Sequence, residues 1–464
     1  MTEGREKGIL EFFRPSTCVP SWSNDLAACL TGAERITMVP IYSWNTPEVK
    51  SYLDRIGSRG SEIPAEVEQL VQQILREVRT QGDAALRKFT KEFDGIELGD
   101  LRIDPQEIHS LASQVDSGIR DVVRLAKKNI HRFHEFQLEK SWEFEAEEGV
   151  WLGQRIQPLQ SVGLYVPGGT AAYPSTLLMN AIPAQIAGVP RIVVVTPYQQ
   201  FKKNPIIAAV LEELNLTEVY GVGGAQAVAA LAFGTATIPR VDKIVGPGNL
   251  YVATAKRHVF GVVDIDMIAG PSEVVVVADE SVDPDFVAAD LMAQAEHDEN
   301  ACAIALTLSR DLATSIRDSL ARQIKDLSRE KVIRKSLENY GAIIIATTRD
   351  EAAEAVNAIA PEHLELLLQD PEPLADKIHS AGAIFFGPYS CEPVGDYFAG
   401  PNHVLPTSGT ARFASPLGVY DFLKRTSLIR YSQSALQKNR AYIETLALSE
   451  HLDAHAQSVR VRFK

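Results

Sequence analysis

The chain has 464 residues, of which 45% are hydrophobic and 23% charged, a composition typical of globular proteins and not of disordered or fibrous ones. This length exceeds what one ordinary core can hold, so we expect roughly two to four domains. The formal net charge of −14 argues against nucleic acid or an anionic membrane as a partner, and no window approaches the roughly 20 apolar residues that cross a bilayer.

The cysteines and the first residues indicate the compartment. Four cysteines, at positions 18, 29, 302 and 391, form no CxxC pair, so the sequence predicts neither a disulfide framework nor a thiolate zinc site. Residues 1–25 include acidic residues and lack a continuous apolar run, which argues against a secretory signal or an organellar transit peptide. A reducing cytoplasm is therefore the expected location.

The amino-terminal part of the chain has a helical pattern. We expect an N-terminal extension over residues 1–37 and a small N-terminal segment over 38–61. From Pro64 to Val78 the apolar residues recur at helical spacing, with a proline in the first turn, and further helical pattern continues to about residue 140.

The period then changes to short apolar runs that alternate with helix-length stretches. The first runs are SVGLYVPGG, RIVVVTP, EVYGVGG and KIVGPG, and the alternation is typical of βαβ units around a parallel sheet. Glycine-rich turns follow at 166–172, 221–227 and 246–249, where backbone N–H groups can approach a phosphate. None is a complete G-x-G-x-x-G fingerprint, so ordinary strand-to-helix turns explain these loops equally well.

A second alternating series begins with EVVVVAD at 273 and continues through AIALTLS, AIIIATT, ELLLQD and AIFFG. The fold class we predict is therefore α/β, with two Rossmann-like parallel-sheet domains plus small helical N- and C-terminal segments. Residues 62–164 together with 273–417 would form a first, discontinuous domain, and 165–272 the second. Residues 418–464 would be helical, and the stretch 442–459 is polar enough to suggest that it packs on a neighbouring subunit.

Two segments carry residues that suit catalysis or metal binding. Glu362 and His363 are adjacent inside an apolar run, and a carboxylate beside an imidazole suits acid–base chemistry near neutral pH. The same sequence is also compatible with two surface residues that have no catalytic role. Gln294 and His297 share one face at the end of a helical stretch. A metal could use that face, but glutamine is an unusual zinc ligand, and the helix dipole alone favours a histidine there.

Two further segments are ambiguous. Asp396 and His403 lie in GDYFAGPNHVLPT, a loop by composition, where they are either functional groups or parts of ordinary turns. Near the end, His451 and His455 are spaced to share a helical face beside Glu450, as metal ligands or as the solvated side of an amphipathic helix.

Taken together, these segments resemble the histidinol dehydrogenase family from about Met38 to the C-terminus. The motifs that carry the resemblance, in the family's order, are VGLYVPGG, GVGGAQAVAALAFGT, VDKIVGPGN, DIDMIAGPSEVVVVAD, DLMAQAEH, APEHLEL, GDYFAGPNHVLPT and LDAHAQSVRVR. The resemblance implies a zinc- and NAD-dependent enzyme of histidine biosynthesis. Such an enzyme oxidises L-histidinol through L-histidinaldehyde to L-histidine and consumes two NAD.

The resemblance also implies roles for individual residues. Glu362 and His363 match the catalytic positions, with His363 as the base and Glu362 polarising water in the second oxidation. One zinc per subunit would be held by Gln294, His297, Asp396 and His455. The positions that match substrate contacts are Ser272, Gln294, His297, His363, Asp396, Glu450 and His455. The positions that match NAD contacts are Tyr165, Gln226 and Asn249.

The family's homodimer, in which the C-terminal region reaches the partner's active site, would explain the polar stretch at 442–459 and make Glu450 and His455 act in trans. Residues 1–37 have no counterpart in the usual family chain, so Met38 is a candidate initiator. Two rivals differ in chemistry. A related enzyme would keep the metal and catalytic residues but oxidise another primary alcohol, and a non-redox phosphate- or nucleotide-binding protein would bind no zinc and reduce no NAD.

Overall fold

The computed structural model describes residues 39–59, 63–168 and 174–463, all within the unit Met38–Lys464. The predicted N-terminal extension, residues 1–37, lies outside the described residues. Among the helices that are described, none is both long and apolar enough to cross a membrane.

A six-stranded parallel sheet contains the second series of predicted strands. Its order is β1 (Ile41–Ser43), β11 (Ala342–Ile345), β10 (Cys302–Thr307), β9 (Glu273–Ala278), β12 (His363–Leu367) and β13 (Ala383–Phe386). Its four central strands are buried along their whole length, which explains their continuous apolar sequences. One face packs against α11 (Pro284–Ala295), α12 (Arg310–Gln323) and α13 (Glu330–Tyr340). The other packs against α1 (Pro47–Gly57), α14 (Arg349–Ile359) and α15 (Glu372–Ala375).

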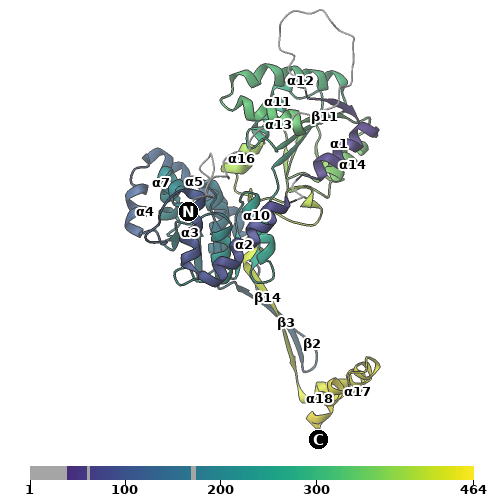
Figure 1. Cartoon of the computed structure of the whole chain (residues 1–464). Helices are drawn as coiled ribbons and strands as arrows, with labels where there is room; N and C mark the ends of the chain where they lie inside the picture. Colours follow the sequence, from purple (N-terminus) through teal and green to yellow (C-terminus); the bar gives the residue numbers. More distant parts are fainter. Residues whose placement is uncertain (1–38, 60–62, 169–173, 464) are drawn as a thin grey trace, which may run out of the picture. The chain divides into compact units, whose positions relative to one another are not determined.

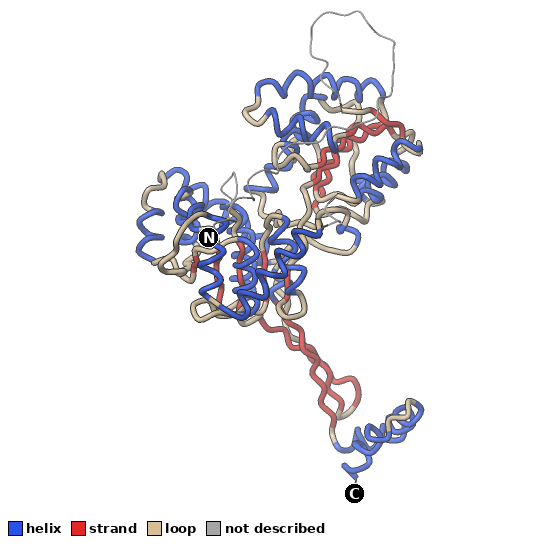
Figure 2. The backbone as a smooth tube through the Cα atoms, viewed as in Figure 1, coloured by secondary structure: helices blue, strands red, loops and turns tan. Residues whose placement is uncertain are grey.

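A five-stranded parallel sheet contains the first series. Its order is β6 (Val219–Tyr220), β5 (Arg191–Val195), β4 (Ser161–Tyr165), β7 (Lys243–Val245) and β8 (Asp264–Ile265), the doubly wound arrangement of Rossmann-like folds. One face is covered by α4 (Pro105–Ala112), α5 (Ser117–Glu135), α6 (Pro174–Ala187), α7 (Tyr198–Lys203) and α8 (Pro205–Glu213). The other is covered by α2 (Ala65–Gln81), α3 (Asp83–Asp94), α9 (Gly224–Phe233) and α10 (Leu250–Val259). In Figure 2, helices flank the strands of both sheets, so the predicted α/β class with two parallel-sheet domains is confirmed.

The buried clusters correct the predicted domain boundaries. Helices α2 to α5 pack on the five-stranded sheet, so residues 62–164 do not join 273–417 in one domain. Residues 38–61 are not a separate segment either, because β1 and α1 belong to the six-stranded sheet and its cover. Helical periodicity shows which face of α2 is apolar, but it does not show which sheet that face meets.

A third, antiparallel sheet was not predicted. Strands β2 (Trp142–Glu147) and β3 (Val150–Pro158) pair with β14 (Leu423–Tyr431), so the segment 418–464 is not wholly helical (Figure 1). After β14 come α17 (Gln433–Ser449) and α18 (Asp453–Arg460), which are separate helices because His451 has a left-handed φ of 60°. Because His451 lies in the break between the two helices and His455 lies in α18, the predicted shared helical face of His451 and His455 is wrong.

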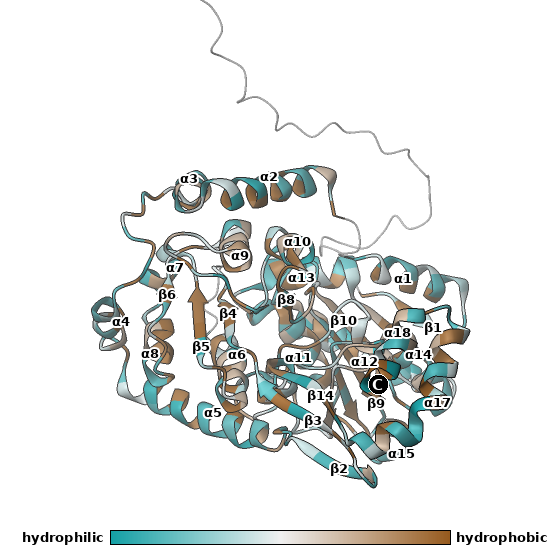
Figure 3. Cartoon of the chain, turned by 90° about the horizontal axis from the view of Figure 1, so that it is seen from below, coloured by the Kyte–Doolittle hydropathy of each residue, from teal (hydrophilic) through white to brown (hydrophobic). Residues whose placement is uncertain are grey.

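The strands of the two kinds of sheet differ in hydropathy. In Figure 3 the buried strand β5 is brown, whereas β2 of the antiparallel sheet is mostly teal.

Candidate active site and metal-binding cluster

The predicted acid–base pair lies at the amino-terminal end of β12. Helix α14 ends at Ile359 because Ala360 adopts a left-handed φ of 52°, and Pro361 then leads the chain into Glu362 and the first strand residue, His363. Both side chains are buried, at 6% and 4% exposure. The pair is therefore buried at the end of a central strand of the six-stranded sheet and is not a pair of surface residues.

The neighbouring strand β9 orients both members of the pair through one backbone residue. The N–H of Glu273 donates to Glu362 Oε2 at 3.0 Å, and the Glu273 carbonyl oxygen lies 3.2 Å from His363 Nδ1. An Nδ1–H that donates to this carbonyl leaves the Nε2 lone pair available, and Nε2 is a buried atom with no hydrogen-bond partner among the described residues. His363 Nε2 is therefore the ring atom that can accept a proton when the imidazole is neutral.

Glu362 and His363 do not form a hydrogen-bonded dyad. Glu362 Oε2 and His363 Nδ1 are 4.0 Å apart. The carboxylate accepts instead from the Glu273 N–H, while the ring faces the Glu273 carbonyl. The two groups can therefore act on different atoms of one substrate.

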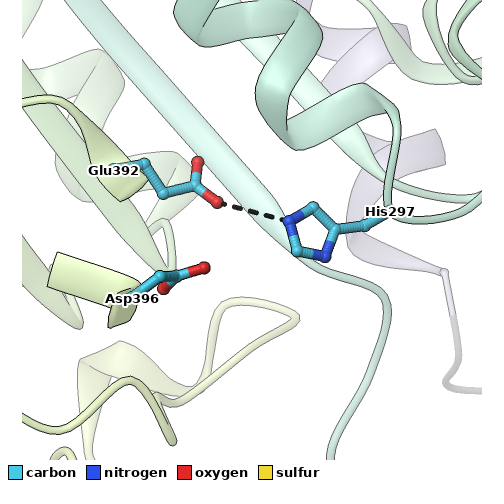
Figure 4. A group of neighbouring side chains, drawn as sticks. All are labelled: His297, Glu392 and Asp396. Carbon is cyan, nitrogen blue, oxygen red and sulfur yellow. Dashed lines mark ion pairs between the residues drawn. The ribbon is translucent and has the colours of Figure 1, made fainter. Parts of the chain in front are cut away.

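Beside the pair, three side chains have ligand atoms that all lie within 4.8 Å of one another: His297, Glu392 and Asp396. His297 follows the C-terminal end of α11, and the two carboxylates come from α16 (Glu392–Tyr397), one helical turn apart. Figure 4 shows the three side chains converging, with Glu392 Oε1 3.8 Å from His297 Nε2. Nitrogen and carboxylate oxygen donors in this number suit a divalent cation such as zinc.

Gln294 joins this metal-binding cluster to the acid–base pair. It is fully buried, and its amide nitrogen, turned toward the Glu273 carbonyl oxygen, lies 3.1 Å from that acceptor. His363 Nδ1 is 3.2 Å from the same nitrogen, but as an N–H donor to Glu273 it does not accept from Gln294. The same nitrogen lies 3.3 Å from Glu392 Oε2. The predicted ligands Gln294, His297 and Asp396 are therefore brought together.

The pKa values reflect an excess of buried negative charge. Burial raises the pKa of Glu392 to about 8 and that of Glu362 to about 7. Burial lowers the pKa of His363, but Glu392, Glu362 and Asp396 outweigh it and raise that pKa to about 10. Burial also opposes ionisation of Asp396, yet His363 and His403 hold its pKa below the usual value. A pKa of about 10 keeps His363 protonated near neutral pH. A cation at these carboxylates would neutralise the charge that holds this proton, so the donor set fits a metal and the base role of His363 would depend on that metal.

Two other predicted residues lie at the edge of the site. His403 Nδ1 is 2.9 Å from the backbone oxygen of Asp396, and its Nε2 is 3.5 Å from Thr176 Oγ1. Ser272 immediately precedes Glu273, and its backbone oxygen accepts from the N–H of Cys302 at 2.9 Å. Asp396 itself is helical and not in a loop as predicted, since α16 extends to Tyr397.

The predicted cofactor residues gather at the carboxyl edge of the five-stranded sheet. Tyr165 ends β4, and its hydroxyl accepts from the N–H of Gly224, the first residue of α9, at 3.0 Å. Gln226 lies in the first turn of α9, is 2% exposed, and has a buried Oε1 without a hydrogen-bond partner in the described structure. Asn249 caps α10 by accepting from the N–H of Val252 at 3.2 Å. Ligands of doubly wound sheets bind at this edge.

Glu450 and His455 are not brought to the cluster. Both are exposed, at the end of α17 and in α18. Within the residues that the structure describes, no hydrogen bond or ion pair links either side chain to His297, Glu392 or Asp396.

Sequence reasoning missed two contributors to the site. One is Glu392, whose i, i+4 spacing to Asp396 in EPVGD was the available signal. The other is the buried ion pair of Arg59 with Glu273, at 2.5 Å, which anchors the residue whose backbone orients the acid–base pair. No local signal could reveal that pair, because its members are 214 residues apart.

Comparison with known proteins identifies relatives over most of the chain. The histidinol dehydrogenase family model matches residues 58–463. Histidinol dehydrogenase of Halalkalibacterium halodurans is 53% identical over 397 residues, covering 85% of this chain and 93% of that protein. The Listeria monocytogenes enzyme of serovar 1/2a is 51% identical over 399 residues, covering 86% and 93%. A crystal structure of histidinol dehydrogenase from Elizabethkingia anophelis has a TM-score of 0.86 and 35% identity, covering 91% of this chain and 98% of that one. The chain belongs to the histidinol dehydrogenase family.

Proposed function

We propose that the protein oxidises L-histidinol to L-histidine through L-histidinaldehyde, with two NAD as hydride acceptors and one zinc ion per subunit. The observation that carries the proposal is the free Nε2 of His363, held beside Glu362 and next to the metal-binding cluster. Membership in a family whose named members are histidinol dehydrogenases supports the substrate.

In the first oxidation, the alcohol loses a hydride from carbon and a proton from oxygen. His363 Nε2 takes the proton, while its Nδ1–H stays on the Glu273 carbonyl and keeps the ring in place. NAD supplies the hydride acceptor. Because the Glu273 backbone fixes the orientation of the ring, the base is preorganised before the reaction begins.

In the second oxidation, water adds to the aldehyde before a second hydride leaves. Glu362 polarises that water, because one of its oxygens is fixed by the Glu273 N–H and burial keeps its pKa, at about 7, close to the working pH. His363 accepts the proton that the hydrate loses. Each oxidation releases two electrons, which accounts for two NAD per histidinol.

The cluster would hold the zinc ion through Gln294, His297 and Asp396, with His455 of a second copy completing the set. When bound, the ion supplies a positive charge and a template for the amino and imidazole groups of the substrate. Glu450 of that second copy would supply a negative group for the cationic substrate.

The proposed homodimer is supported by the apolar surface of the C-terminal arm, which we define as β2, β3, β14, α17 and α18. Large apolar side chains are exposed there: Trp142 at 52%, Phe144 at 50%, Ile429 at 73%, Tyr442 at 75% and Leu446 at 65%. Surface of this kind calls for a partner, and a second copy that also receives Glu450 and His455 accounts for both observations.

The proposed compartment is the cytoplasm. Cys302 and Cys391 are both free thiols, which suits a reducing environment.

The test is the amount of NADH formed per L-histidinol consumed, measured on zinc-loaded and chelator-stripped protein. We expect about two NADH per histidinol, as the four-electron reaction requires, with activity lost on stripping and restored by zinc. One NADH per histidinol would contradict the second oxidation. Zinc binding without any reaction on histidinol would favour a related enzyme that oxidises another alcohol.

A further inference from the structure

The five-stranded sheet contains a buried ion pair that the proposed reaction does not use. Lys256 lies on α10 and Asp266 follows β8, and their side chains are 2% and 1% exposed. The ammonium group of Lys256 donates to Asp266 Oδ1. Burying two charges has a large desolvation cost, and a protein with well-packed apolar side chains at such positions is often as stable as one with the ion pair. The pair therefore needs an explanation beyond stability.

Both charged groups bind the same glycine at the start of the loop Gly246–Asn249. The N–H of Gly246 donates to Asp266 Oδ2 at 2.7 Å, and Lys256 Nζ donates to the Gly246 carbonyl oxygen at 3.0 Å. Asp266 Oδ1 also accepts from the N–H of Met267 at 2.6 Å. Gly246 is thus held on both of its backbone polar groups.

The backbone conformation of Gly246, which the ion pair holds, sets the positions of two predicted NAD-contacting residues, Tyr165 and Asn249. Gly246 has a φ of +112°, and a Cβ there would lie 2.2 Å from the backbone oxygen of Tyr165. The loop then ends at Asn249, the N-cap of α10. Tyr165 and Asn249 therefore take their relative positions from the residue that Lys256 and Asp266 bind.

We propose that Lys256 and Asp266 are positioning residues that preorganise the loop Gly246–Asn249 for NAD. The inference rests on the proposed binding of NAD at this edge of the sheet. A preformed loop spares the cofactor the cost of ordering it, so the pair contributes to NAD affinity without touching the reacting atoms.

The same strand supplies a matched control. Lys243 begins β7, is 5% exposed, and donates to the backbone oxygen of Asp421 at 2.9 Å, with its Nζ 3.1 Å from Asp264 Oδ2. It is also a buried lysine in an ion pair, but it lies at the opposite end of the strand from Gly246. Lys243→Met thus removes a buried lysine without releasing the loop.

The experiment compares Lys256→Met, Lys256→Arg and Lys243→Met in the zinc-loaded, full-length protein. NAD binding is measured by calorimetry, and the KM values for NAD and L-histidinol by NADH formation. Lys256→Met should raise the Kd and KM for NAD about tenfold, the effect of losing about one net hydrogen bond, at an unchanged KM for histidinol. Lys256→Arg should restore most of the affinity, and Lys243→Met should bind NAD like the unaltered protein.

An unchanged NAD affinity in Lys256→Met, or an equal loss in Lys243→Met, would overturn the inference. If Lys256→Met does not fold, the double variant Lys256→Met with Asp266→Asn decides, because it leaves no unpaired buried charge; NAD affinity equal to that of the unaltered protein would then overturn the inference. Unaltered protein that binds no NAD at all would overturn the proposed function instead.

Discussion

At the residue scale, Glu392 is the least expected member of the site, and its role can be tested apart from catalysis. Its carboxylate is 1% exposed and faces His297 and Asp396, so Glu392→Gln removes an anionic donor from the cluster while keeping its size. We expect zinc affinity to fall by about 10- to 100-fold. Zinc competition with a chromogenic chelator measures this.

The matched control for that change is Glu372→Gln. Glu372 also begins a short helix, α15, but it is exposed and outside the metal-binding cluster. Its zinc affinity should equal that of the unaltered protein. Equal affinities in Glu392→Gln and Glu372→Gln would remove Glu392 from the set of metal-binding groups.

Most of the site residues could be predicted from their residue types, whereas the others are recognised only from their positions in the fold. Glu362, His363 and His297 could be selected from sequence because their chemistry is informative at short spacing. Glu392 was missed because α16 has only six residues, too few for a helical period to show, so its i, i+4 spacing to Asp396 had no helical pattern around it. Arg59 and Glu273 meet only through the fold.

At the element scale, alanine substitutions at Gly246 and Gly261 allow the cost of a disfavoured φ to be measured apart from the cost of a steric clash. Both have positive φ, +112° and +97°, but a Cβ at Gly246 meets the oxygen of Tyr165, whereas one at Gly261 has no atom within 4 Å. Gly261→Ala should lower the free energy of unfolding by about 1–2 kcal/mol, the cost of a disfavoured φ. Gly246→Ala should lower it by about 2–5 kcal/mol, because overpacking adds to that cost.

Urea denaturation of the two variants measures this difference. Similar losses in both would show that the loop yields to make room at Gly246. Circular dichroism before denaturation confirms that each variant is folded.

The strands that the sequence predicts most clearly are those that are buried on both faces. β9 reads EVVVVA and every residue is buried, so its apolar run is unmistakable. β2 was missed although WEFEAE alternates apolar and acidic residues, and β14 has no such regular alternation. Every residue of the two strands is exposed or half-buried, so neither strand has the continuous apolar run by which strands such as β9 were predicted. The grouping of residues 62–164 failed for a different reason, since α2 could have packed on either sheet.

At the scale of the whole molecule, the proposed sharing of active sites between two copies predicts complementation between inactive chains. His363→Asn and His455→Asn should each be inactive alone. If His455 acts in trans, hybrid dimers regain one site of two. Random reassociation makes half of the dimers hybrids, so activity should recover to about a quarter of the unaltered level.

The control mixture is His363→Asn with Glu362→Gln, whose changes fall on the same side of the site. No hybrid of these chains has a complete site, so no recovery is expected. Absence of recovery in the first mixture as well would place His455 outside the partner's site.

The pairing of β1 with β11 also protects the molecule against self-association. Residues 41–43 cover the outer edge of β11, whose four residues are apolar and buried. β1 then becomes the edge strand of the sheet, but it has only three residues and ends in a serine, whereas β11 is wholly apolar. A short edge strand offers few unpaired N–H and C=O groups to strands of other molecules, so these three residues reduce the tendency of this edge to aggregate.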